Sequence, residues 1–239
     1  MTKVEAIEAV MKLHGGSASL KTIYDEIEQF YPTAKVSKDW DAGLRGVLYR
    51  DIYNGKRFKK IGDSIYALTD YTPESIPSAD KQRMHSFIEG ICVELGNSQN
   101  FQTFTADPSA MYRDKVYLRD LTTLTALPEF TYPHILHEAR LIDVLWFDQG
   151  KYPFPKYAFE VVDSIGTLDG AFKRCFQLAN FRTKFYIIAP EKHHAKFEQA
   201  LSLDIYSHVR NYFEFKNYDS LCDTYDMLVK GREVLSWLQ

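Results

Sequence analysis

Residues 141–190 read LIDVLWFDQGKYPFPKYAFEVVDSIGTLDGAFKRCFQLANFRTKFYIIAP, and this stretch decides the fold of the larger part of the chain. It predicts an apolar strand with one acidic residue, Asp143, and a second apolar strand with another, Glu160. A helix and a third strand over 185–189 follow. A carboxylate inside an apolar strand is costly unless it is paired or bound to a metal. Two such carboxylates on adjacent strands therefore predict a shared divalent cation.

The sequence on either side of this stretch continues an alternation of strands and helices. A helix over about 81–95 precedes it and ends at Gly96. The later elements are expected as a helix over 167–180, a strand over 184–189, a helix over 191–201, a strand over 209–215 and a helix over 218–229. This alternation predicts an α/β domain, a mixed sheet with flanking helices, over residues 81–239. Residues 97–135 mix proline, threonine and aromatic residues and give no clear assignment.

The first 70 residues predict a separate module. Apolar residues recur with a helical period over 3–13, Ser19 can cap a second helix over 20–30, and a third helix is expected from Asp39 or Asp41 to about Tyr53. Residues 57–69 predict two short strands around a turn. Three helices and a hairpin describe a winged helix. Residues 71–80, which carry two prolines and small polar residues, predict a linker.

A basic segment lies in this module. Residues 35–60 hold eight Lys or Arg and three Asp, a local charge of 8 − 3 = +5. Such a segment is typical of a surface that binds duplex DNA, with Arg45 and Arg50 of the third helix placed to read guanine and the lysines placed to contact phosphates. The predicted DNA-binding residues are Lys35, Lys38, Arg45, Arg50, Lys56, Arg57, Lys59 and Lys60.

Composition narrows the class of protein. The chain has 239 residues, 45% of them hydrophobic, and a net charge of −3, so it is not a uniformly basic nucleic-acid protein. Its three cysteines are isolated in sequence, which predicts a reduced, cytoplasmic protein without a zinc site. We expect no membrane partner, because no apolar run reaches the length of a membrane span.

The order Asp143, Glu160, Val161 resembles the core motif of the PD-(D/E)XK nuclease superfamily, the fold of many restriction enzymes. The resemblance covers roughly the last two thirds of the chain. The N-terminal module is similar to the winged helices of the Mrr-like and HARE-HTH groups, above all in Gly62, Tyr66 and Leu68. The resemblance implies an endonuclease that cleaves double-stranded DNA with Mg²⁺ or Mn²⁺, held by Asp143, Glu160 and the carbonyl of Val161.

The sequence departs from that family at one position. The family places a Lys, Glu or Gln two residues after the motif glutamate, where this chain has Val162. Asp163 is one residue late and should point to the opposite face of the strand. We expect Lys173, and after it Gln177, to replace the missing catalytic side chain from the next helix. Glu89 and Glu94 are candidates for a further carboxylate, whereas His85 and the other histidines are expected to be structural or exposed.

Three functions are compatible with these patterns. The first is a metal-dependent DNA endonuclease of the restriction type, guided by its winged helix. The second is a catalytically impaired DNA-binding protein that kept the nuclease fold and lost its active site at Val162. The third is an assembly subunit whose winged helix binds protein. A homodimer stays open at this stage.

Overall fold

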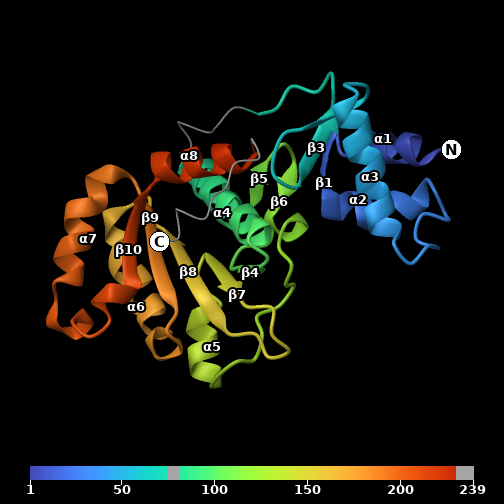
Figure 1. Ribbon diagram of the computed structural model, residues 1–239. Helices are drawn as coiled ribbons and strands as arrows, with labels where there is room; N and C mark the ends of the chain where they lie inside the picture. Colours follow the sequence, from blue (N-terminus) through green and yellow to red (C-terminus); the bar gives the residue numbers. More distant parts are fainter. Residues whose placement is uncertain (75–80, 230–239) are drawn as a thin grey trace.

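The computed structural model of the chain describes residues 1–74 and 81–229 (Figure 1). Residues 75–80 of the predicted linker and residues 230–239 of the predicted C-terminal domain lie outside the described part. The described residues form a mixed α/β structure with a three-stranded sheet, a five-stranded sheet and a two-stranded ribbon. None of the helices in the described ranges is long and apolar enough to cross a membrane.

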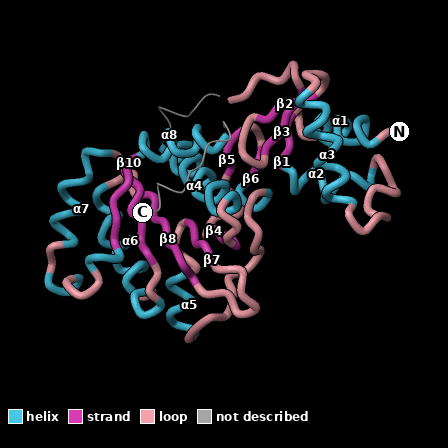
Figure 2. The backbone as a smooth tube through the Cα atoms, in the orientation of Figure 1, coloured by secondary structure: helices cyan, strands magenta, loops and turns pink. Residues whose placement is uncertain are grey.

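The N-terminal part contains three helices and a small antiparallel sheet (Figure 2). In chain order its elements are α1 (Lys3–Leu13), β1 (Ser17–Ser19), α2 (Leu20–Glu26), α3 (Trp40–Tyr53), β2 (Phe58–Lys60) and β3 (Ile65–Leu68). The strand order is β1-β3-β2. The three helices and the hairpin are confirmed, while β1 was not expected from the sequence.

Local signals explain where these elements begin. Thr2 and Glu5 form a capping box at the start of α1, and the Ser19 hydroxyl accepts a hydrogen bond from the amide of Thr22 to cap α2. The apolar faces of the helices meet in one core with residues of the small sheet, including Ile7, Leu48 and Phe58. The module therefore has a hydrophobic core of its own.

The larger part is built on the five-stranded sheet, in the order β10-β9-β8-β7-β4. Strands β8, β9 and β10 run parallel, and β7 and β4 are antiparallel to their neighbours. Its elements are α4 (Lys81–Ser98), β4 (Gln102–Thr105), β5 (Met111–Arg113), β6 (Val116–Tyr117), α5 (Pro133–Ala139), β7 (Val144–Phe147), β8 (Pro155–Val161), α6 (Leu168–Phe176), β9 (Lys184–Ala189), α7 (His194–Leu201), β10 (Phe213–Asn217) and α8 (Tyr218–Val229). The predicted mixed sheet is confirmed, although α6 ends before residue 180 and β10 begins after residue 209.

Helices cover both faces of this sheet (Figure 1). One layer is α4 and α8, whose apolar residues pack with Trp146, Phe159 and Val161 of the strands. The other is α5, α6 and α7, which pack with Ala158 and Val162 and the rest of the second core. Alternation along β8 therefore places Glu160 toward the α6 layer, because it shares a face with Ala158 and Val162.

The two predicted carboxylates lie at the same end of the sheet. Val144 pairs with Phe159, so Asp143 and Glu160 are opposite one another where β7 begins and β8 ends. We expected Asp143 inside the strand, but the structure places it immediately before β7. The side chain of a residue at a strand end can turn more freely than one within the ladder, and the Asp143 carboxylate turns to accept a hydrogen bond from the amide of Val161.

Candidate metal centre

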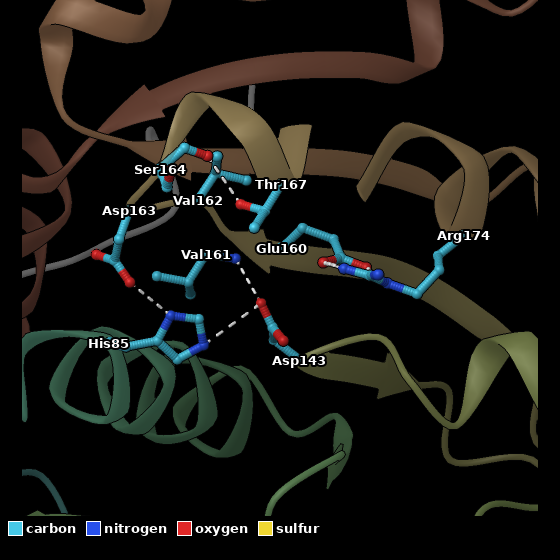
Figure 3. Close-up of a pocket in the computed structure, with 9 residues that line it drawn as sticks. All are labelled: His85, Asp143, Glu160, Val161, Val162, Asp163, Ser164, Thr167 and Arg174. Atoms are coloured by element: carbon cyan, nitrogen blue, oxygen red, sulfur yellow. Dashed lines mark hydrogen bonds and ion pairs between the residues drawn. The ribbon is translucent and has the colours of Figure 1, made fainter. Parts of the chain in front are cut away.

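A cavity of about 250 Å³ opens at this end of the sheet (Figure 3). It draws side chains from α4, the start of β7, the end of β8 and α6. The polar side chains that line it are His85, Asp143, Glu160, Asp163, Ser164, Thr167 and Arg174. The cavity therefore brings together residues that are far apart in sequence, and two of its acids, Asp143 and Glu160, are the predicted metal ligands.

Asp143 occupies the centre of this arrangement. Its Oδ2 accepts a hydrogen bond of 2.7 Å from the backbone amide of Val161, which ties the start of β7 to the end of β8. The side chain is 16% exposed and lines the cavity. The backbone bond fixes the carboxylate where an ion or a positive side chain can meet it.

Helix α4 adds two groups one turn apart, His85 and Glu89. His85 Nε2 lies 3.7 Å from Glu89 Oε1 and 3.8 Å from Asp143 Oδ2. Its other ring nitrogen, Nδ1, lies 2.8 Å from Asp163 Oδ2, as Figure 3 shows. Burial by itself lowers the pKa of His85, but Asp143 and Asp163 outweigh this and raise it to about 10. The imidazole is therefore protonated at neutral pH and held among three carboxylates.

Glu89 is 2% exposed, and few polar groups contact its carboxyl group. Burial, followed by the negative charge of Asp143, raises the pKa of Glu89 well above its usual range, and His85 only partly opposes this. Among the described residues no hydrogen bond donor reaches its carboxylate, and its ion-pair partner is His85 at 3.7 Å. A buried carboxylate in this condition favours a bound cation.

Glu160 has a different partner. It is 1% exposed, and both of its oxygens accept hydrogen bonds from Arg174 of α6, from Nε at 2.7 Å and from Nη2 at 2.5 Å. Burial raises the pKa of Glu160 to about 8, although the Arg174 bonds lower it, and Asp143 adds to the rise. The bidentate pair follows from the direction of Glu160, which points to the α6 layer, while Glu89 lies in the α4 layer.

The donor set fits a divalent metal. His85, Glu89 and Asp143 each offer a ligand atom, and these atoms lie within 4.8 Å of one another. Carboxylate oxygens suit Mg²⁺ and Mn²⁺. Glu89, Asp143, Glu160 and Asp163 place four carboxylates at the cavity or against it, and two cationic side chains, His85 and Arg174, face them. Burial raises the pKa of Glu89 and of Glu160, so a cation bound at this point would favour the ionised form of both carboxyl groups.

The expected ligand set differs from the group of side chains that the structure brings together. We expected Asp143 and Glu160 to share a cation, and the structure instead groups Asp143 with Glu89 and His85. A site shared by Asp143 and Glu160 stays a prediction. His85 was expected to be structural or exposed; it lies partly buried beside Asp143 and Asp163, and its role stays a prediction. The signal that was available is the spacing of His85 and Glu89, which places both on one face of a helix.

The structure places Val162, Asp163 and the two expected substitutes, Lys173 and Gln177, in three different environments. Val162 is 1% exposed and packs in the core below α6. Asp163 faces the α4 layer, opposite to Glu160 as expected, and still lines the cavity because the cavity spans the end of β8. Lys173 and Gln177 are exposed and do not line the cavity. Arg174, the neighbour of Lys173, is the cation that points inward.

Glu94, one further candidate, serves the contact between the two parts of the chain. It is fully buried and accepts bonds of 2.8 Å from the amide and the hydroxyl of Ser64, in the turn between β2 and β3. The hydroxyls of Tyr112 and Tyr225 donate to its other oxygen. Arg113 donates to the carbonyl of Ile61 at 2.6 Å and to Tyr225. The Glu94 carboxylate is thus satisfied by the protein and is not part of the cavity.

The predicted DNA-binding residues divide into paired and unpaired groups. Ion pairs join Lys35 to Glu28, Arg45 to Asp41, Arg57 to Glu8 and Lys60 to Asp63. Lys59 donates to the carbonyls of Thr69 and Tyr71. Within residues 1–74 and 81–229, Lys38, Arg50 and Lys56 are exposed and form no ion pair. The charges of these three side chains are therefore the ones that are not balanced by a neighbouring acid and can contact DNA phosphates.

Comparison with known proteins agrees with the restriction-enzyme resemblance at the level of the family. No curated protein and no solved structure matches the chain. Residues 69–236, well over half of the chain and including every residue of the cavity, match the family model of the Type II restriction enzyme NmeDI C-terminal domain. The chain therefore belongs to the family of the Type II restriction enzyme NmeDI C-terminal domain.

Proposed function

We propose that the chain is a divalent-metal-dependent DNA endonuclease of the PD-(D/E)XK type, with residues 1–70 as a winged-helix module that binds duplex DNA. The observation that carries this is the group His85, Glu89 and Asp143, with ligand atoms within 4.8 Å of one another at the end of a mixed sheet. Membership in a restriction-enzyme family supports DNA as the substrate. Residues 71–80 are then the linker and residues 81–239 the catalytic domain.

The roles follow from the chemistry of each group. Asp143 and Glu89 would hold Mg²⁺ or Mn²⁺, with His85 as a further ligand or as a positive group beside it. When bound, such an ion polarises the phosphate and makes water more acidic. Asp163 orients His85 by its bond to Nδ1, so that Nε2 faces the two carboxylates. The backbone amide of Val161 fixes Asp143.

Arg174 is the replacement for the family's missing lysine. It lines the cavity, and its charge is held in place by Glu160. A fixed guanidinium at this point offsets charge that develops on a phosphate during cleavage. Lys173 lacks that position, since it is exposed and outside the cavity. The two neighbours on α6 therefore form a matched pair for mutagenesis.

The test uses the full chain with methylated and unmethylated plasmid, with Mg²⁺, Mn²⁺ or EDTA. Wild-type protein is expected to cleave only with a divalent ion, and Asp143→Asn to lose cleavage. Arg174→Ala should lower the single-turnover rate about 10²-fold or more, the scale of losing one charge-stabilising group, while Lys173→Ala stays near wild type. Equal losses for the two variants would remove the role given to Arg174.

A specific observation favours the second candidate, a nuclease-fold DNA-binding protein with an impaired active site. Val162 is buried in the core at the position of the family's catalytic side chain, and both oxygens of Glu160 are occupied by Arg174. Under this function the wild type binds duplex DNA and fails to cleave it with either metal and in either methylation state. The plasmid assay therefore separates the two functions.

A further inference from the structure

A second cavity, of about 330 Å³, lies beside the candidate metal centre. It opens where β4 ends, at Thr105 and Ala106. The amide of Ala106 donates a hydrogen bond of 3.1 Å to the carbonyl of Asp143, and Thr105 pairs with Val144 of β7. The second cavity is thus lined by Ala106, which bonds the backbone of Asp143, and Asp143 lines the first cavity.

The lining of this second cavity is basic and hydroxylic. Arg119 and Arg140 border it, together with three threonines, and none of its lining residues is acidic. Arg140 is exposed, and within the described ranges it forms no ion pair. Arg119 stacks over the ring of Tyr117, with 4.4 Å between the guanidinium carbon and the ring centre, and its charge is only weakly met by Asp120 at 3.9 Å.

The N-terminal part holds the loop that carries one of these arginines. Lys21 of α2 donates to the carbonyls of Arg119 and Thr122, at 2.7 and 3.1 Å. Ser19 at the cap of the same helix donates to the carbonyl of Asp120. The loop is therefore anchored from outside the larger domain.

From these features we infer that the second cavity binds one nucleotide of a DNA strand, next to the phosphate that the metal centre would receive. Two arginines and threonine hydroxyls are the donors that phosphate oxygens require. Phe104 and Leu124 supply an apolar floor against which a sugar or base can pack. The volume is at the lower end of small-molecule sites, about 300 to 1,000 Å³. This inference rests on the proposed function, because it extends the DNA path from the metal centre.

The experiment measures binding of a fluorescent duplex to the full chain in EDTA over a salt series. The variants are Arg140→Ala, the double variant Arg119→Ala/Arg140→Ala, and Arg140→Lys. The control is Lys151→Ala, which removes an exposed charge from the loop between β7 and β8, at the other end of those strands. Each lost phosphate contact should make the slope of log affinity against log salt shallower by about 0.9. Arg140→Lys should keep the slope and weaken binding, since it keeps the charge and loses the paired donors.

Unchanged slope and affinity in the double variant would overturn the inference, provided that circular dichroism shows all variants folded. Thymidine 3′,5′-bisphosphate and inorganic phosphate, used as competitors, distinguish a nucleotide site from a site for free phosphate. Equal competition by both would also overturn it. Cleavage in Mg²⁺ is scored separately. If the wild type binds DNA, the arginine variants bind it more weakly and no protein cleaves it, the nucleotide site is supported and the nuclease function is refuted. If the wild type cleaves DNA and the arginine variants bind it as tightly as wild type, only the nucleotide site is refuted.

Discussion

Two buried glutamates on one helix should respond in opposite directions to the same substitution. Glu89 and Glu94 lie on α4 and are 2% and 0% exposed. Glu94 accepts four hydrogen bonds from protein donors, two on each oxygen. Glu89 has an ion-pair contact to His85 at 3.7 Å. We therefore predict that Glu94→Gln destabilises the metal-free protein and that Glu89→Gln stabilises it.

The magnitudes follow from these contacts. In Glu94→Gln, an amide group replaces one carboxylate oxygen, and it can turn toward the hydroxyls of Tyr112 and Tyr225, which can accept from it. At least one of these hydroxyls then loses the acceptor for its own proton, and a buried donor without an acceptor costs about 1–3 kcal/mol, so the free energy of unfolding should fall by roughly that amount. Burial and Asp143 disfavour the charged form of Glu89 and raise its pKa, so the folded protein gains little from this carboxyl. A neutral amide of the same size should therefore keep or raise the free energy of unfolding.

Urea unfolding in EDTA near neutral pH, followed by tryptophan fluorescence, measures both changes. Added Mg²⁺ or Mn²⁺ then supplies a second readout, because a ligand at about 100 times its dissociation constant raises stability by about 2.7 kcal/mol. Wild type and Glu94→Gln should gain this stability, and Glu89→Gln should not. Changes of the same sign in EDTA, or an equal gain from the metal in Glu89→Gln, would refute the assignment of the two side chains.

Two further predictions concern the same helix. Asp143 and Asp163 raise the pKa of His85 to about 10 against the effect of burial. The stability that protonated His85 gives to the folded state is therefore complete below about pH 6.5 and is lost as pH rises through 10. Urea unfolding in EDTA across this range should show a steeper fall in the free energy of unfolding for wild type than for His85→Gln. Gly90→Ala would place a Cβ 2.2 Å from the Tyr112 ring. This overlap should lower the free energy of unfolding, measured by thermal unfolding, by about 1–3 kcal/mol. An ordinary helical position would instead gain about 1 kcal/mol from alanine.

Much of the fold could be predicted because it depends on local signals. The helical period over 3–13, the Ser19 cap and the apolar strands around Glu160 each act over a few residues, and the structure confirms them. The strand β1 could not be predicted in this way. It has three residues and forms because Ser17, Ala18 and Ser19 pair with β3, about 50 residues later in the chain.

The candidate site was only partly predictable, because its geometry depends on which layer each side chain enters. The sequence identified Asp143, Glu160 and Glu89 by type. It could not show that Glu160 points toward α6 and meets Arg174, or that the turn of α4 brings His85 to the same cavity. The choice between Lys173 and Arg174 meets the same limit: one residue along a helix rotates the side chain by about 100°, and the local sequence does not define the face of α6 precisely enough to choose.

Two cationic side chains explain how four carboxyl groups can lie together at one end of the sheet. Protonated His85 stands among Glu89, Asp143 and Asp163, and Arg174 holds Glu160. The two cations differ in kind, since a guanidinium stays charged at all accessible pH values while an imidazole can give up its proton. His85 is therefore the group that can yield its positive charge to a divalent ion, and Arg174 the one that keeps its charge for the substrate. Loss of metal binding in Arg174→Ala would contradict this division.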